Sequence, residues 1–101
     1  MAEPAYTVTI ARDLQDLVPQ FIANRRTELE ALRSALAAGR YRQLGELGHR
    51  MRGVGTSYGF DRVSVLGGQI EAGAARTNYD ELAARIAEYA DYLARVTVVY
   101  E

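Results

Sequence analysis

Hydrophobic and polar positions follow two different periods along this chain. Residues 6–10 read Tyr-Thr-Val-Thr-Ile and alternate apolar with polar side chains, so we expect an extended lead-in over residues 1–12. From about residue 13 to residue 98 the apolar positions recur every three or four residues, which is the spacing of one face of a helix. The pattern predicts a short helical turn at 13–17 and then four long amphipathic helices.

Residues typical of helix ends separate these four stretches. Pro19 suits the first turn of the first long helix, where its missing N–H costs nothing, and Gly39 suits the end of that helix. The second helix is expected to run from about residue 41 to residue 58 and to end at Gly59. Asp61 is expected to cap the third helix, because its carboxylate can accept from the unpaired amides of the first turn. Phe60 and Val65 stand at the two positions of a hydrophobic staple around that cap.

The fourth helix opens near Asp80 and Glu81, and its end is ambiguous. Tyr89, Leu93 and Val96 keep helical spacing into the run Val-Thr-Val-Val-Tyr at 96–100, but these β-branched residues also suit a strand beside residues 6–10. We expect a helix there. Short connections between four such helices predict an all-α fold, an antiparallel up-down four-helix bundle over about residues 13–98 with a short N-terminal helix.

Composition and charge narrow the possible functions. A chain of 101 residues with 49% hydrophobic residues is expected to form a single domain, 1–101. A net charge of −1 argues against a nucleic-acid binder, and the absence of cysteine excludes disulfides, iron–sulfur sites and thiolate zinc sites. The sequence shows neither a signal peptide nor the roughly 18 apolar residues of a membrane span. We therefore expect a cytoplasmic protein that binds neither nucleic acid nor membrane.

His49 is the only histidine, and it is the candidate for chemistry. At about 100° per residue it falls opposite the apolar sector of the second long helix, so its imidazole should face solvent. Its neighbours on this face, three, four or seven positions away, are Gly45, Glu46, Arg52, Gly53 and Thr56. The two glycines leave both flanks of the imidazole open to a large partner.

Four glycines inside one helix lower the intrinsic stability of that helix. Gly45, Gly48, Gly53 and Gly55 together cost about 3–4 kcal/mol of intrinsic helix stability relative to alanine. Gly48 and Gly55 lie nearer the core, where close packing of helices explains them. Gly45 and Gly53 lie on the His49 face, where a docking surface explains them better than packing does.

These residues resemble a known family. The segment His49-Arg50-Met51-Arg52-Gly53, with Gly59 ten residues after the histidine, resembles the His-x-Leu-Lys-Gly…Gly signature of histidine-containing phosphotransfer (HPt) domains. The resemblance covers nearly the whole chain, including Pro19-Gln20-Phe21 to Arg25-Arg26, Gly59-Phe60-Asp61 and Gln69-Ile70-Glu71. Two positions depart from the signature, Met51 for leucine and Arg52 for lysine, in a chain whose 12 basic residues are all arginine.

The resemblance implies a role for each residue of the motif. His49 would accept a phosphoryl group from the phospho-aspartate of a receiver domain and pass it to another receiver aspartate, as in bacterial two-component phosphorelays. Arg52 would stabilise the phosphoryl oxygens. The residues Gly45, Glu46, Arg50, Gly53 and Thr56 would contact the partner, whereas Gly59 and Asp61 would be structural.

The resemblance also implies the partners. A response-regulator receiver domain is the expected partner, and a hybrid histidine kinase is a further candidate. No cofactor or metal site is expected in this chain, and Mg²⁺ should come from the receiver's acidic pocket. Residues 40–62 carry a local net charge of +3, which suits such a pocket. The surface glycines argue against burying His49 in a dimer, so we expect a monomer.

Two other functions compete with a phosphocarrier, which we expect to be a carrier and not a true enzyme, since these 101 residues show no ATP-binding or kinase domain. An interaction-only bundle would bind a receiver or kinase without carrying phosphate, but it would not need His49. A histidine-kinase dimerisation domain fits poorly, because its usual acid after the histidine is replaced here by Arg50.

Overall fold

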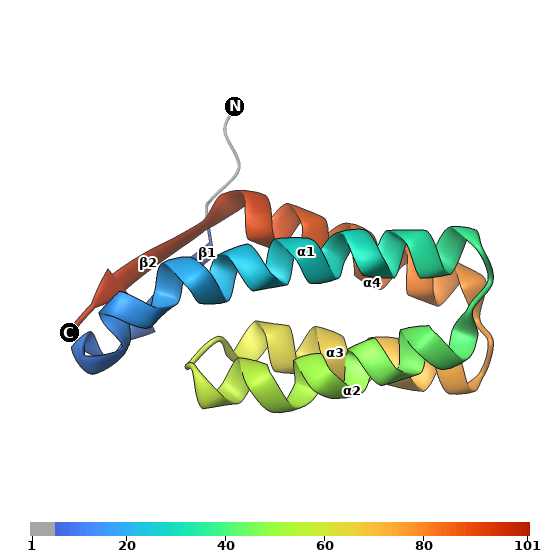
Figure 1. Cartoon of the computed structure of the whole chain (residues 1–101), viewed down its shortest axis with the longest axis horizontal. Coiled ribbons are helices and arrows are strands. Elements are labelled where there is room, and N and C mark those ends of the chain that lie inside the picture. Colours follow the sequence, from blue (N-terminus) through green and yellow to red (C-terminus); the bar gives the residue numbers. More distant parts are fainter. Residues whose placement is uncertain (1–5) are drawn as a thin grey trace.

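Four long helices, drawn in Figure 1 for the computed structural model, make up most of the structure, which describes residues 6–101. In chain order the elements are β1 (Tyr6–Ile10), the 3₁₀ helix η1 (Arg12–Leu17), α1 (Val18–Ala37), α2 (Tyr41–Ser57), α3 (Asp61–Ala75), α4 (Tyr79–Arg95) and β2 (Val96–Tyr100). One layer contains α1 and α4, the other contains α2 and α3, and successive helices run in opposite directions (Figure 1). The predicted four-helix bundle and its short N-terminal helix are confirmed. Residues 1–5 of the expected lead-in lie outside the described residues.

The apolar faces expected from the sequence meet in one core. Its largest fully buried side chains are Tyr89, Tyr92, Phe60, Ile10, Leu32, Leu44, Met51, Leu66, Ile70, Leu82 and Val63. Phe21 of α1 stacks on Phe60 with ring centroids 4.7 Å apart, which places the start of α1 over the corner between α2 and α3. All four helices contribute to this core, so the position of each depends on the other three.

Backbone conformation marks the corners of the bundle. Gly39 (φ 67°) follows α1 and Gly59 (φ 86°) follows α2, and both adopt the left-handed conformation that glycine allows at low cost. Both predicted helix ends are therefore confirmed, and the left-handed backbone at Gly59 is consistent with the structural role expected of it. A side chain on Gly59 would also approach Ile10 Cδ1, at 3.0 Å from the added Cβ.

The predicted cap of the third helix is wrong. Phe60 is the N-cap of α3, Asp61 is already inside the first turn, and within residues 6–101 no side-chain hydrogen bond caps this helix. The predicted staple is wrong as well, since Phe60 is fully buried while Val65 is 59% exposed. The reason is that Phe60 packs against Phe21 in the core, which pulls the helix start one residue earlier. Asp61 still carries negative charge at the positive end of the helix dipole.

Residues 96–100 form strand β2, so the helix expected there is wrong. This strand pairs in parallel with β1, with Tyr6 opposite Val96 and Ile10 opposite Tyr100. The ladder continues past the strands, where Glu101 N–H donates to Ile10 O (3.2 Å) and Arg12 N–H donates to Glu101 O (2.9 Å). The β-branched run favours extended backbone, and β1 supplies the hydrogen-bond partners that a strand needs.

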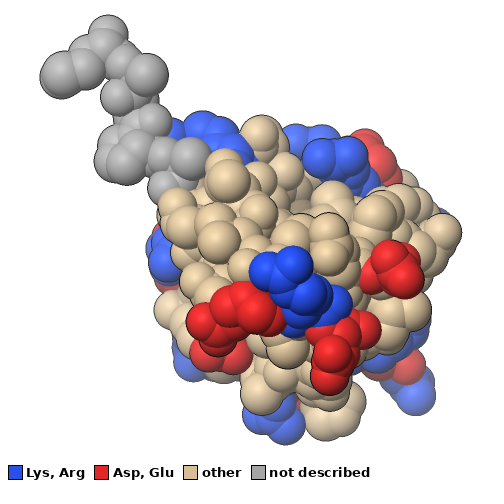
Figure 2. Space-filling view, turned by 90° about the vertical axis from the view of Figure 1, so that its left-hand side faces the viewer, with Lys and Arg blue, Asp and Glu red and all other residues tan. Residues whose placement is uncertain are grey.

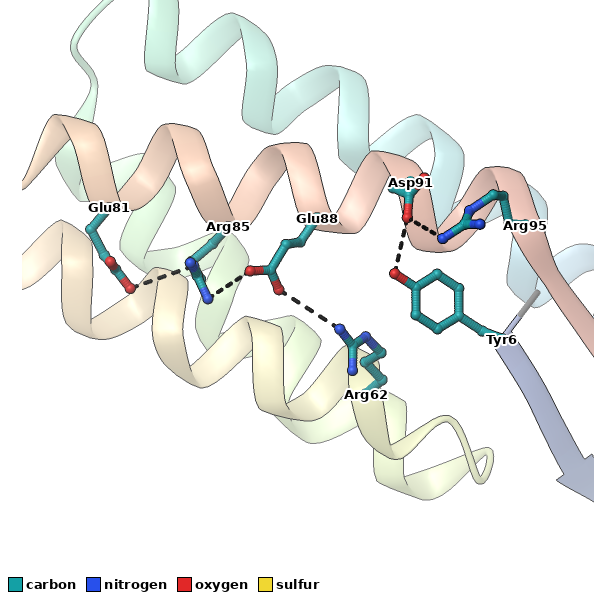
Figure 3. Close-up of polar contacts among 7 residues, drawn as sticks. All are labelled: Tyr6, Arg62, Glu81, Arg85, Glu88, Asp91 and Arg95. Atoms are coloured by element: carbon teal, nitrogen blue, oxygen red, sulfur yellow. Dashed lines mark hydrogen bonds and ion pairs between the residues drawn. The ribbon is translucent and has the colours of Figure 1, made fainter. Parts of the chain in front are cut away.

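Ion pairs and hydrogen bonds tie α4 to α3 and to β1 (Figure 3). Arg85 binds Glu81 (3.5 Å) and Glu88 (2.8 Å), and Glu88 reaches Arg62 of α3 at 3.9 Å. Near the end of α4, Asp91 accepts hydrogen bonds from Arg95 and from the Tyr6 hydroxyl, both at 2.9 Å. Both hydrogen bonds lower the pKa of the Asp91 carboxyl, and the one from Arg95 has the larger effect.

A buried carboxyl group joins α1 to α4. Glu28 is 8% exposed, accepts a hydrogen bond from the Tyr89 hydroxyl (2.9 Å) and lies 3.5 Å from the guanidinium of Arg25. Burial raises the pKa of Glu28 despite the opposing effect of Arg25, and it raises the pKa of Tyr89 as well. The hydrogen bond between Tyr89 and Glu28 is therefore a buried polar contact between α1 and α4.

The end of the bundle that carries the strands shows charges of both signs. Figure 2 shows a basic patch there with acidic residues on either side, set in a largely uncharged surface. No broad field of one sign covers this face. Among residues 6–101, no helix combines the length and the apolar character needed to cross a bilayer.

Candidate functional site

Glycines bring α2 and α3 into backbone contact. A Cβ added at Gly48 would lie 2.7 Å from the backbone nitrogen of Glu71 and the backbone oxygen of Gly67. A Cβ added at Gly55 would lie 2.6 Å from the backbone nitrogen of Ser64. The close packing expected at Gly48 and Gly55 is therefore confirmed, and it places side chains of α3 within reach of His49.

His49 faces solvent, as its helical phase predicted. Its side chain is 64% exposed, and its Nδ1 lies 2.9 Å from Oε2 of Glu71 on α3. A carboxylate oxygen can only accept, so Nδ1 carries the hydrogen and donates it. In the neutral imidazole the other nitrogen, Nε2, then holds the lone pair.

Arg52 lies one turn after His49 and binds the same carboxylate. Its Nη1 is 3.2 Å from Glu71 Oε1, and its side chain is 56% exposed. Each oxygen of Glu71 thus holds one of the two side chains. We call His49, Arg52 and Glu71 the His–Arg–Glu cluster.

An open groove of about 580 Å³ lies beside His49, toward the start of α2. Its lining residues come from both helices: Tyr41, Arg42, Gly45, Glu46, His49, Arg50, Glu71, Ala74 and Ala75. A Cβ added at Gly45 would meet only the Cβ of Ala74, at 3.6 Å, so small residues form this part of the groove. The groove brings together His49 and three of the residues expected to contact a partner, Gly45, Glu46 and Arg50.

The other two expected contact residues lie outside this groove. Gly53 is exposed, and an added Cβ would have nothing within 4 Å, so the second flank of His49 is open as expected. Thr56 is exposed, but its N–H and its hydroxyl both donate to the Ser64 hydroxyl oxygen, at 2.7 and 2.8 Å. Thr56 therefore holds α2 to α3, and its expected contact with a partner stays a prediction.

A family model for the Hpt domain matches residues 16–97. The chain belongs to the Hpt domain family. The match confirms the resemblance carried by the His49 motif, and it gives this Hpt domain a role in histidine phosphotransfer within phosphorelays, with receiver domains and kinases as partners. Neither a search of curated proteins nor a search of solved structures found a match.

Sequence reasoning missed five residues that line the groove beside His49 in this Hpt domain: Tyr41, Arg42, Glu71, Ala74 and Ala75. Glu71 belongs to the segment that resembled the family, but its contact with His49 depends on how α2 and α3 are aligned. Arg42 stands seven residues before His49, two turns along the same helix face, so its place in the groove had a signal in the sequence. Tyr41, at the start of α2, had none.

Glu71 also changes the charge of this face. The count over residues 40–62 included only α2 and its flanks, whereas the cluster places a carboxylate from α3 between His49 and Arg52. Within residues 6–101, no three His, Asp or Glu side chains gather as they would around a metal ion.

Proposed function

We propose that His49 of this Hpt domain accepts a phosphoryl group from the phospho-aspartate of one receiver domain and passes it to the aspartate of another. The observation that carries the proposal is the orientation of the imidazole. Nδ1 is held by Glu71, while Nε2 belongs to a largely exposed side chain on an open helix face. The nucleophilic nitrogen is thereby selected before any partner arrives.

The bonds made and broken in the transfer step belong to the neutral imidazole and the incoming acyl phosphate. The Nε2 lone pair attacks phosphorus, the N–P bond forms, and the bond between phosphorus and the aspartyl oxygen breaks, which releases the receiver's carboxylate. The ring keeps its hydrogen on Nδ1 and becomes positively charged. Glu71 accepts the hydrogen bond from Nδ1 and stabilises the positive charge on the ring, so its contribution is larger after transfer than before it.

Arg52 can serve the phosphoryl group without leaving Glu71. A guanidinium has five N–H donors, and the contact with Glu71 involves Nη1 alone. The remaining donors can bind phosphoryl oxygens on His49 by charge-assisted hydrogen bonds. Arginine at this position thus performs the task expected of the family's lysine.

The partner supplies the rest of the chemistry. A receiver's acidic pocket would bring the Mg²⁺ that neutralises phosphoryl charge, and Arg42 and Arg50 beside His49 would attract that pocket. The groove with Gly45 and Glu46 would receive the partner on one flank of His49, and Gly53 would leave room on the other. We expect one copy of the chain to suffice, acting as a monomer in the cytoplasm.

Incubation with phosphorylated receiver domains tests the proposal. The wild-type chain should gain phosphate that is labile in acid and stable in alkali, and His49→Gln should gain none. Because the chain has one histidine, label on a folded His49→Gln variant would contradict the proposal. Receiver binding by the wild-type chain without any label would instead favour the interaction-only bundle.

A further inference from the structure

A second groove, of about 380 Å³, lies between β1 and the start of α3. It is lined by Tyr6, Thr7, Val8, Thr9, Gly59, Asp61, Arg62 and Tyr92, and it shares no residue with the groove beside His49. Nothing in phosphotransfer requires it. One wall is the edge of β1, which presents backbone groups to a ligand. The other wall is the start of α3, which presents charged side chains.

Among the residues that the structure describes, the strand wall is an unpaired edge. Ile10 O and Arg12 N–H both bind Glu101, so even-numbered residues of β1 direct their backbone groups toward β2. Backbone groups alternate in direction along a strand, and those of Thr7 and Thr9 must point the other way, toward the groove. Tyr6–Ile10 contains no charged residue, proline or glycine, the usual protection of an exposed edge. This edge can therefore pair with another strand.

The helix wall offers a positive charge. The first turn of α3 has no side-chain cap, and Gly59 before it adds no bulk. Arg62 has a 46% exposed side chain whose ion pair with Glu88 is long, at 3.9 Å, so a closer carboxylate can compete for it. Asp61 beside it disfavours a segment that is acidic throughout.

Tyr92 of α4 also lines the groove, and its buried hydroxyl lacks an acceptor among the described residues. Tyr92 is 1% exposed, and among the described residues its hydroxyl has no hydrogen-bond partner. Burial raises the pKa of this hydroxyl to about 12, so it stays a donor at neutral pH. A buried donor without an acceptor is unfavourable, and a carbonyl or carboxylate in the groove would provide one once the side chains that cover the hydroxyl move aside.

We propose that this groove binds one extended segment of a partner protein, which adds to β1 as a third strand and places a carboxylate side chain against Arg62. The geometry favours a single free strand over a second copy of the chain. The β1 strand of a second copy already carries β2 on its other edge, so a second copy would have to bring a two-stranded sheet to a groove of about 380 Å³. Main-chain pairing to Thr7 and Thr9 would give affinity, and Arg62 would select the side chain.

A capped synthetic pentapeptide, Thr-Val-Glu-Val-Thr, tests the proposal on the full chain. Saturating peptide should slow amide hydrogen exchange at Thr7 and Thr9 by at least about tenfold and leave His49's neighbours unchanged. The same peptide methylated on its backbone nitrogens keeps every side chain but cannot donate to β1, and it should give no protection. Equal protection by both peptides would overturn the proposal.

Variants separate the strand wall from the helix wall. Thr9→Pro removes a groove-facing N–H that β2 does not use, and it should abolish binding while amides of the β1–β2 ladder stay protected. Arg62→Gln should weaken binding about tenfold, whereas Arg33→Gln, at a similarly exposed arginine, should leave it unchanged. If Arg62→Gln binds as well as wild type, the carboxylate preference is wrong.

Two further results would decide the occupant and the independence of this groove. His49→Gln should bind the peptide as wild type does, because the groove lies outside the phosphotransfer site. Protection of Thr7 and Thr9 that appears without peptide and rises with protein concentration, together with a dimer in sedimentation, would overturn the proposal in favour of a second copy.

Discussion

At the scale of single residues, Glu71 connects nucleophile and arginine. It accepts from His49 through one oxygen and from Arg52 through the other. Glu71→Ala should slow phosphotransfer to His49 by about 10–100-fold, because it removes a hydrogen bond that links two opposite charges once the ring has been phosphorylated. Single-turnover labelling from a phosphorylated receiver measures the rate.

The variant Glu71→Gln separates two effects of Glu71, its orientation of the His49 imidazole and its negative charge. The amide oxygen can still accept from Nδ1, so nitrogen NMR of the imidazole should show the hydrogen on Nδ1, as in wild type, while the transfer rate falls to an intermediate value. In Glu71→Ala the hydrogen should distribute over both nitrogens. Wild-type rates in both variants would mean that Glu71 only packs against α2.

Glu28 makes stability depend on pH. Burial raises its pKa above the ordinary value of 4.5, so the folded chain keeps this proton at pH values where the unfolded chain has lost it. The free energy of unfolding therefore falls as pH rises from 4.5 through the raised pKa. Glu28→Gln cannot titrate but can still accept from Tyr89, so its stability relative to wild type should rise over the same interval. Urea denaturation at about pH 5 and about pH 8 measures this difference; an equal or opposite difference would show that Glu28 is not protonated more readily in the folded chain.

Properties of single residues could be predicted from the sequence where they depend on one helix alone. The exposure of His49 and the open flank at Gly53 follow from helical phase alone. The contact between His49 and Glu71 could not be predicted in this way, since the two are 22 residues apart and meet only through the alignment of α2 with α3. The alignment of two helices is set by how they pack. It cannot be predicted from the spacing of apolar residues within either helix.

At the scale of elements, two glycines of α2 should respond oppositely to alanine. Gly53→Ala should stabilise the chain by about 0.5–1 kcal/mol, because its Cβ meets nothing and alanine favours the helix. Gly48→Ala should destabilise it by about 1–3 kcal/mol, because its Cβ would lie 2.7 Å from backbone atoms of α3. Urea denaturation of both variants measures the difference.

The same pair tests whether the α2–α3 contact positions the site. Forcing these helices apart at Gly48 moves Glu71 away from His49, so Gly48→Ala should also slow phosphotransfer in molecules that remain folded. Gly53→Ala should transfer at nearly the wild-type rate. Equal stability of the two variants would mean that α2 and α3 can separate without loss.

Helix starts show why element boundaries were predicted unevenly. The Asp61 side chain could cap a helix, but Phe60 is buried in the core, and the helix therefore starts one residue earlier than predicted. Asn78, which was not predicted as a cap, caps α4 by accepting from the Glu81 N–H at 3.1 Å. Local chemistry names candidates for a cap, and packing on either side of the turn selects among them.

At the scale of the whole molecule, the bundle followed from the sequence because each apolar face is long and regular. The pairing of β1 with β2 did not, because the run at 96–100 continues the spacing of α4 and its strand partner lies some 90 residues earlier. Only a fold that brings residues 6–10 beside the end of α4 decides between helix and strand. Tyr6, held by Asp91 and packed between Arg62 and Arg95, marks that meeting point.

Two exposed threonines can test the alignment of the strands. Thr97 directs its N–H toward β1, whereas Thr7 directs its own toward the groove. Thr97→Pro should cost about 1–3 kcal/mol, since it removes a ladder hydrogen bond and leaves a β1 carbonyl unpaired. Thr7→Pro removes no ladder bond and should cost less than about 1 kcal/mol. Thermal unfolding followed by far-UV dichroism gives both values, with a largely helical spectrum in each. If Thr7→Pro is the more damaging change, the two strands are offset by one residue from the alignment described here, and the edge that faces α3 is the even-numbered one.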